Sequence, residues 1–150
     1  MRIVLGNTSC DMDSAVGALC LAYLYSRQFP TEVHVPVINC ARASFYTNIE
    51  IVKHFEQCQI PLDHLYFYDE FMAQFPNPAD VEEVALIDHN LLDPTQNALN
   101  DKVTRVVDHH VDSGAYEGQL KHKTCHLVGS ACALVALMCK EQQVLLEEDL

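Results

Sequence analysis

Several features that mark other classes of protein are scarce or missing in this chain. No apolar run approaches the ~18 residues of a membrane-spanning helix, and residues 1–4 enter an expected strand without the apolar stretch of a signal peptide. No two of the seven cysteines form a C-x-x-C pair, which argues against a thiolate zinc site or a disulfide framework. We therefore expect a cytoplasmic protein with no membrane partner.

Basic residues are also few, 9 against 21 acidic ones, for a formal net charge of -12. This balance argues against a nucleic-acid partner, because binding through phosphates needs a basic surface. The 150 residues suffice for one domain with a sizeable core and leave no room for a second. Most of the cysteines stand among Ala, Leu and Val, so we expect inert, buried thiols in a reducing compartment.

Apolar, β-branched runs alternate with segments of helical periodicity along the whole chain. Strands are predicted at residues 2–6, 32–38, 65–68, 83–87, 103–107 and 124–128, and helices at 14–28, 47–57, 70–74 and from Gly129 onward. This alternation predicts an α/β fold, a mostly parallel sheet flanked by helices on both faces. A new amphipathic segment begins at Val144 and stops at once, so we expect one domain, residues 1–150, truncated at its C-terminal end.

Three clusters of potential metal ligands follow predicted strands. Asp11 and Asp13 follow the first strand, Asp88 follows the fourth, and His109 with His110 follows the fifth, after Asp108. In a parallel sheet the carboxyl ends of the strands share one edge, and ligands bind there. The sequence therefore predicts one metal-binding site built from three separate segments.

The ligand types indicate two divalent metal ions rather than one. Asp11 and Asp13 can diverge toward two ions ~3.5–4 Å apart, with Asp88 as the bridge and His109 completing one ion. Such oxygen-rich sites suit manganese, magnesium or cobalt. A two-metal site of this kind catalyses hydrolysis of a phosphoester or phosphoanhydride, and His110 would orient the scissile phosphate or share a proton with it. Ser130, at an expected helix start, offers an anion site.

Each cluster also has an ordinary structural interpretation. Asp13 before Ser14 is a common helix N-cap, and Asp88-His89-Asn90 could be a turn. The convergence of all three clusters favours the metal site. The remaining histidines and arginines have no motif behind them: His34, His54 and His64 are expected to be structural or exposed, whereas His122, His126, Arg42 and Arg105 could reach a phosphate only through tertiary proximity.

The ordered motifs resemble the DHH phosphoesterase superfamily. They are Gly6-Asn7-x-x-x-Asp11-x-Asp13-Ser14, Asp88-His89-Asn90, Asp108-His109-His110 and Val128-Gly129-Ser130. Within the superfamily the chain looks most like the N-terminal domain of the prune and cytosolic exopolyphosphatase branch. The resemblance spans nearly the whole chain.

The resemblance implies a binuclear hydrolase of phosphoanhydrides such as polyphosphate that uses two Mn2+ or Mg2+ ions. Asp11 would serve the first ion, Asp13 and His109 the second, and Asp88 both, with His110 facing the phosphate. Asn7 stands where family II inorganic pyrophosphatases carry a histidine; it leaves the first ion more open to substrate and favours the exopolyphosphatase branch. The family's further metal aspartate and its C-terminal domain, which brings basic residues to the phosphates, would follow this chain, so we expect weak turnover or none from it alone.

Other functions remain open from the sequence. One alternative is a prune-like interaction or regulatory protein with weak phosphodiesterase activity, for which protein partners would matter. A second is an inorganic pyrophosphatase or a RecJ-like oligonucleotidase, although the acidic charge argues against the latter.

Overall fold

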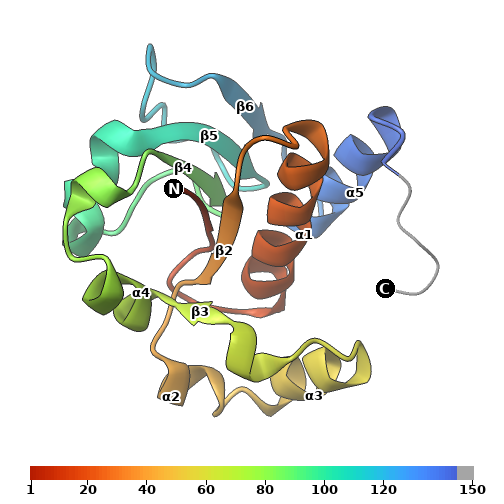
Figure 1. Cartoon of the computed structure of the whole chain (residues 1–150). Coiled ribbons are helices and arrows are strands. Elements are labelled where there is room, and N and C mark those ends of the chain that lie inside the picture. The colour runs from red at the N-terminus through yellow and green to blue at the C-terminus, as the bar shows by residue number, and fades with distance from the viewer. Residues whose placement is uncertain (145–150) are drawn as a thin grey trace.

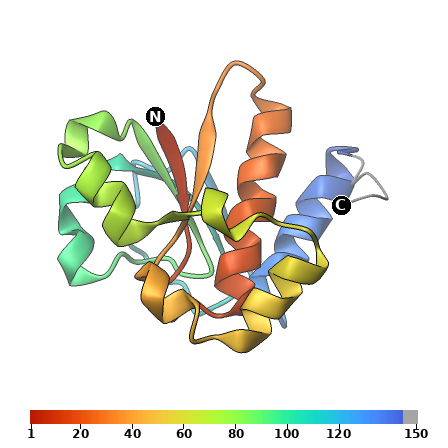
Figure 2. The ribbon, with the colours of Figure 1, turned by 60° about the horizontal axis from the view of Figure 1, so that its bottom comes forward.

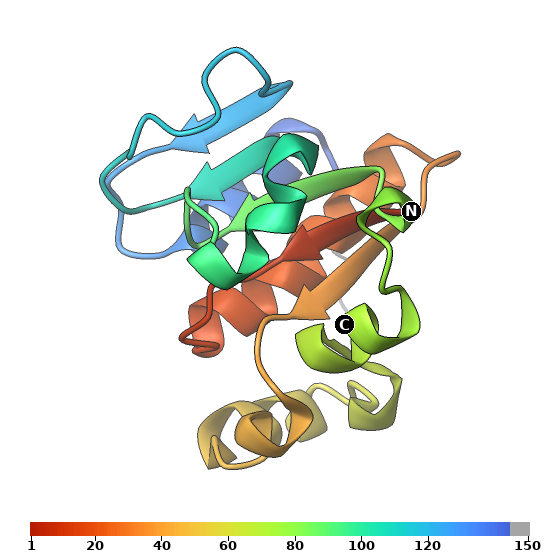
Figure 3. The same cartoon turned by 90° about the vertical axis from the view of Figure 1, so that its left-hand side faces the viewer.

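A six-stranded parallel sheet forms the centre of the molecule in a computed structural model that describes residues 1–144 (Figure 1). The strands are β1 (Arg2–Leu5), β2 (His34–Ile38), β3 (Tyr66–Phe67), β4 (Glu83–Ile87), β5 (Val103–Asp108) and β6 (His122–Cys125). Their order is β3-β2-β1-β4-β5-β6, and each neighbouring pair is parallel. Figure 3 shows the arrowheads pointing the same way, so the loops that follow the strands share one edge. The predicted α/β class is confirmed.

Helices cover both faces of this sheet. They are α1 (Met12–Gln28), α2 (Arg42–Phe45), α3 (Ile49–Gln57), α4 (Tyr68–Gln74) and α5 (Ala131–Glu141), with 3-10 turns η1 (Leu62–His64), η2 (Pro78–Asp80) and η3 (Pro94–Lys102). Figure 2 shows α1 and α5 on one side of the sheet and α4 and η3 on the other. All the connections between parallel strands must cross over the sheet, which is why neither face is left bare.

Alternation along the strands explains the two layers of core. Val4 of β1 packs with α1 and α5, whereas its neighbours Ile3 and Leu5 pack on the opposite face with Phe71 of α4 and Leu99 of η3. A third cluster joins α1 to α3 beside β2 and β3. Central strand β4 is buried at all five positions, as expected for a parallel strand covered on both sides.

The structure corrects several boundaries that were expected from the sequence. The sixth strand is His122–Cys125, not 124–128; it is an edge strand with mixed exposure, so no apolar pattern marks it. The third strand has two residues because Tyr68 begins α4. Helix α1 begins at Met12 with Asp11 as its N-cap, so the N-cap interpretation of Asp13 is wrong. Helix α2 and turn η3 were not expected at all.

Two further expectations concern the cysteines and the end of the chain. All seven thiols are free, but the expectation that most are buried is wrong: Cys10 and Cys139 are buried, whereas Cys20 and Cys58 are exposed. The amphipathic segment expected from Val144 onward lies, beyond that residue, outside the described part of the chain, as does Asp149. Within residues 1–144, no helix is both long and apolar enough to cross a bilayer.

Candidate metal centre

The predicted ligands meet at the carboxyl edge of the sheet, where the strand order reverses between β1 and β4. Successive connections run to opposite sides of this point, and the divergence opens a crevice in which α/β proteins bind ligands. The loops after β1, β4 and β5 line an open hollow of ≈ 360 Å³, with Asn7, Asp88, Asp108 and His110 among its walls. A larger cavity of ≈ 590 Å³ lies between α1 and α3, but its lining contains no carboxylate. Of these two cavities, only the smaller hollow is lined by carboxylates.

Asp88 is the buried centre of the group. Its backbone adopts a left-handed φ of 65°, which Asp tolerates better than most residues, and its side chain is 2% exposed. One carboxylate oxygen lies 3.1 Å from His109 Nε2, and the other accepts a 2.5 Å hydrogen bond from the Asn7 amide. Burial, together with the negative charges of Asp11 and Asp13, raises the pKa of Asp88 to about 6. A neighbouring cation would offset both effects.

His109 is oriented as a metal-binding histidine would be. Its Nδ1 lies 3.0 Å from the Val128 carbonyl oxygen, to which it donates, so the lone pair of the neutral ring is on Nε2. That Nε2 faces the carboxylates of Asp88 at 3.1 Å and Asp13 at 3.5 Å. The hydrogen bond to Val128 and the nearby carboxylates raise the pKa of His109. Two carboxylate oxygens and one imidazole nitrogen thus converge.

Asp13 also contacts the start of helix α5, which the sequence did not reveal. Its carboxylate accepts hydrogen bonds from Ser130 Oγ at 2.6 Å and from the backbone N–H groups of Ala131 at 2.7 Å and Cys132 at 2.9 Å. Burial opposes its ionisation, but these hydrogen bonds outweigh burial and lower the pKa of Asp13. An aspartate near the start of α1 therefore binds the amino terminus of α5, whose partial positive charge favours an anion.

Asp108 and Asn90 hold the histidine loop and received no role from the sequence. Asp108 is fully buried and accepts hydrogen bonds from the His109 backbone N–H and from His110 Nδ1, both at 2.8 Å. The Asn90 amide donates to the other Asp108 oxygen and to the Val111 carbonyl. The first residue of the Asp108-His109-His110 motif is thus a positioning group, and the only signal in the sequence was its place in that motif.

The remaining candidate residues, Asp11, Ser130, Arg42 and Arg105, have other contacts in the structure. Asp11 caps α1 by accepting from Ser14 N–H at 3.0 Å. Ser130 caps α5 and bonds Asp13, so its role in substrate binding stays a prediction. Arg42 pairs with Glu70, and Arg105 lies over the Tyr25 ring, both outside the hollow.

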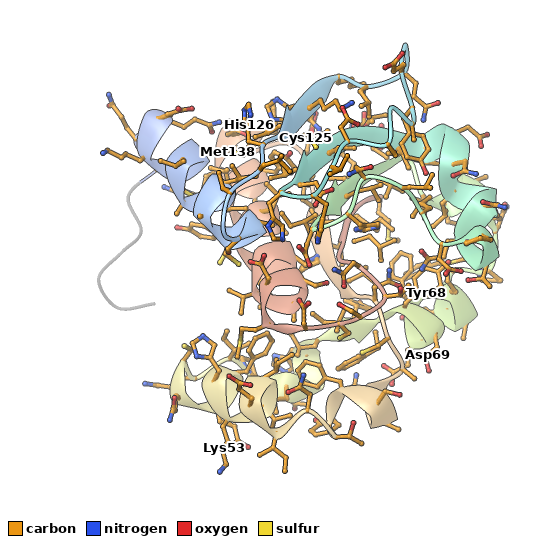
Figure 4. All side chains as sticks on the ribbon, turned by 180° about the vertical axis from the view of Figure 1, so that it is seen from behind. Lys53, Tyr68, Asp69, Cys125, His126 and Met138 are labelled. Carbon is orange, nitrogen blue, oxygen red and sulfur yellow. The ribbon has the colours of Figure 1, made fainter. Side chains whose placement is uncertain are left out.

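None of the histidines without a motif lines the hollow. His126 lies with Cys125 where β6 ends and the chain turns toward α5 (Figure 4), and His122 is hydrogen-bonded to Thr124. His34 is buried in β2, whereas His54 and His64 are exposed, as expected.

The donor set fits a divalent cation. Asp88, His109 and His110 each offer a ligand atom, and these atoms lie within 4.8 Å of one another. Asp13 adds a carboxylate oxygen 3.5 Å from His109 Nε2. Among the ion pairs of residues 1–144, none joins a lysine or arginine to Asp11, Asp13 or Asp88. Carboxylates gathered in a partly buried site without a cationic side chain are characteristic of metal sites.

Comparison with known proteins identifies the family of this chain. The family model described as "DHH family, N-terminal domain" matches residues 2–150. Exopolyphosphatase PRUNE1 of Homo sapiens is 35% identical over 136 residues, which are 90% of this chain and 30% of that protein. The protein of the same name from Mus musculus is 32% identical over 136 residues, with the same two shares. The chain thus spans about a third of the length of these relatives.

A solved structure shares the fold. An exopolyphosphatase-related protein from Bacteroides fragilis superposes with a TM-score of 0.57 at 16% identity, covering 93% of this chain and 38% of that one. At this identity the likeness concerns the fold alone. The family match, by contrast, runs along nearly the whole sequence and includes every residue of the hollow. The chain belongs to the DHH family and corresponds to its N-terminal domain.

Proposed function

We propose that this chain is the metal-binding domain of a phosphoanhydride hydrolase of exopolyphosphatase type. The observation that carries the proposal is the convergence of Asp13, Asp88 and His109 Nε2 at the switch point of the sheet, with distances of 3.1 and 3.5 Å from the imidazole to the two carboxylates. The names of the relatives support the substrate class, since both are exopolyphosphatases.

In this proposal the site would hold two divalent ions, Mn2+ or Mg2+. Asp11 would hold the first, Asp13 and His109 the second, and Asp88 both. When bound, such a pair would activate a water molecule and neutralise phosphate oxygens. Polyphosphate, a chain of phosphoanhydrides, is the proposed substrate, and protein partners remain secondary to it.

The side chains contribute orientation and a proton. Asp108 binds His110 at Nδ1, so the neutral ring carries its proton there and leaves Nε2 free to exchange one with a phosphate oxygen. The His110 side chain is 55% exposed and lines the hollow, as a group that meets substrate must. Asn7 also lines the hollow while its amide holds Asp88, so we assign it a contact with substrate as well as this positioning role.

The lining of the hollow disfavours a long nucleic acid as substrate. It contains no lysine or arginine, and oligonucleotide binding needs several cationic contacts along the phosphate backbone. A short phosphate chain would be held here by the metal ions, with basic residues supplied by the C-terminal domain that the family resemblance implies. The RecJ-like and pyrophosphatase alternatives are distinguished by activity on short oligonucleotides and on pyrophosphate.

The first test is metal binding, measured by isothermal titration with Mn2+. Asp88→Asn should weaken the affinity by at least ~100-fold, because it removes the central carboxylate from a site where even indirect changes cost about 10- to 100-fold. Asp63→Asn, the same chemical change on exposed η1, is the matched control and should bind like the unaltered chain. Equal affinity of the two variants would refute the metal site.

The second test is phosphate release from short polyphosphate with Mn2+. His110→Gln should lower any release by ~100-fold, the usual size of a general acid or base contribution, with Mn2+ affinity within about threefold of the original. An affinity loss as large as that of Asp88→Asn would instead make His110 a metal ligand. Release of phosphate that is insensitive to Asp88→Asn would contradict the proposed mechanism.

A further inference from the structure

Two cysteines meet at the back of the loop that carries the metal ligands. The Sγ atoms of Cys10 and Cys40 lie 2.8 Å apart and are hydrogen-bonded. Cys10 stands between β1 and α1, and Cys40 follows the end of the neighbouring strand β2. All seven cysteines fall within the described residues, and no other pair of them is hydrogen-bonded there. A disulfide requires about 2.05 Å between sulfurs, so the two sulfurs must approach by ~0.8 Å to form one.

The meeting of these thiols is fixed by the sheet. Leu5 of β1 pairs with Val37 of β2, and just beyond this pair the Asn39 amide donates to the Gly6 carbonyl at 2.7 Å. The two strand ends that lead to the cysteines are thus tied together before the thiols are reached. The sheet therefore brings the backbone segments that carry the two thiols side by side.

The two thiols differ in accessibility as an oxidisable pair should. Cys40 is partly exposed, whereas Cys10 is buried and only 6% exposed. The hydrogen bond with Cys10 lowers the pKa of the Cys40 thiol, which favours the reactive thiolate. An accessible thiol beside a resolving thiol is the arrangement of redox-sensitive cysteines.

We propose that Cys10 and Cys40 form a reversible disulfide under peroxide, and that this bond weakens divalent metal binding at the adjacent site. The second half of this proposal rests on the proposed metal function; the first half does not.

The chemistry balances with hydrogen peroxide as oxidant. The O–O bond breaks as Cys40 becomes a sulfenic acid, and one water leaves. The Cys10 sulfur then attacks the Cys40 sulfur, and the Cys10 proton leaves with the hydroxyl group as a second water. Two electrons pass from the thiols to one peroxide, and a dithiol reductant reverses the change.

The consequence for the metal site follows from the contacts of Cys10. Its backbone N–H donates to Asn7 Oδ1 at 3.2 Å, and the same Asn7 amide group holds Asp88. Its next residue is Asp11, which is joined to Asn7 through Ser9 Oγ. Cys10 also has a left-handed φ of 50°, so this turn has little freedom to absorb a shift. Movement of the Cys10 sulfur toward Cys40 therefore displaces ligand-bearing groups.

The bond is tested on the whole chain by mass and thiol count after treatment with hydrogen peroxide. We expect a loss of two thiols and ~2 Da, peptide mapping that joins Cys10 to Cys40, and reversal by dithiothreitol. Cys40→Ser and Cys10→Ser should each abolish the linkage, whereas Cys58→Ser, an exposed cysteine outside the pair, should leave it intact. Linkage through other cysteines, or stable sulfinic acid at Cys40 without linkage, would overturn the proposal.

The coupling is tested by Mn2+ titration of the reduced and oxidised forms. Affinity should fall at least threefold on oxidation and recover on reduction, and Cys40→Ser should show no change with peroxide. Equal affinities would overturn the coupling and leave the disulfide standing. Absence of Mn2+ binding in the reduced form would instead refute the proposed function and the coupling with it, while the linkage by mass remains a separate result.

Discussion

Replacing Asp13 with Asn should destabilise the metal-free fold, although it removes one of several crowded carboxylates. Asp13 accepts from Ser130 Oγ and Cys132 N–H on one oxygen and from Ala131 N–H on the other. An amide in either orientation points an NH2 group at a donor, so at least one hydrogen bond is replaced by a repulsive contact.

The size of the effect follows from two opposing contributions. Hydrogen bonds to a charged group contribute ~1.5–3 kcal/mol, and a negative charge at a helix amino terminus contributes a further ~0.3–1 kcal/mol. Relief of repulsion with Asp88 acts in the other direction. The pKa of Asp13 is lowered in spite of its burial, which means that the ionised form stabilises the fold. We therefore expect a net loss of ~2 kcal/mol in the free energy of unfolding.

Urea denaturation in EDTA at pH 7.5 measures this loss without interference from metal. With a slope of ~1–3 kcal/mol per molar urea, the midpoint should fall by about 1 M. Asp101→Asn, the same change at an exposed position in η3, should leave the midpoint unchanged. A midpoint for Asp13→Asn equal to or above that of the unaltered chain would show that carboxylate repulsion outweighs the helix contacts, and would refute the reasoning.

Two further predictions concern the scaffold. Gly6→Ala would place a Cβ against Ser14 Oγ and 3.0 Å from the Ser14 carbonyl oxygen, and should lower the free energy of unfolding, measured by urea denaturation, by ~1–3 kcal/mol. Gly129→Ala is the control: its added Cβ would meet nothing within 4 Å, so stability should be nearly unchanged. Equal costs for the two variants would contradict the packing argument. Burial lowers the pKa of His34, so its neutral form stabilises the fold above pH ~6.5, and this contribution is lost as the pH falls through the lowered pKa. The stability advantage of the unaltered chain over His34→Leu should therefore shrink between pH 7.5 and pH 5, and an advantage that is constant or grows on acidification would show that His34 is not the titrating group.

Much of the fold could be predicted because the strands carry strong local signals. Runs such as Val84-Ala85-Leu86-Ile87 are apolar throughout, and a parallel strand buried on both faces requires this. Edge strand His122–Cys125 has no such pattern, since it pairs with β5 alone and is held mainly by its backbone. Turn η3 is polar along most of its length and owes its place to Leu99, which packs in the core beneath it.

The candidate site likewise combines residues that the sequence predicts with contacts that it does not predict. Asp88 and His109 were predictable because each follows a strand directly, and strand direction alone brings such residues to one edge. The link between Asp13 and α5 spans more than a hundred residues, and no spacing in the sequence indicates it. The contact of Cys10 with Cys40 likewise depends on the pairing of β1 with β2.

The amino-acid order is enough to specify the fold class, the family and the residue types that gather at the edge of the sheet. These depend on the order of hydrophobic runs and on the residues that end them, both of which are local. The partners of those residues became known from the folded chain: which imidazole nitrogen faces the carboxylates, which aspartate binds a distant helix, and which thiols meet. Such choices depend on distances between segments that are far apart in the chain, and these distances are set only when the strands pair and the helices pack on them.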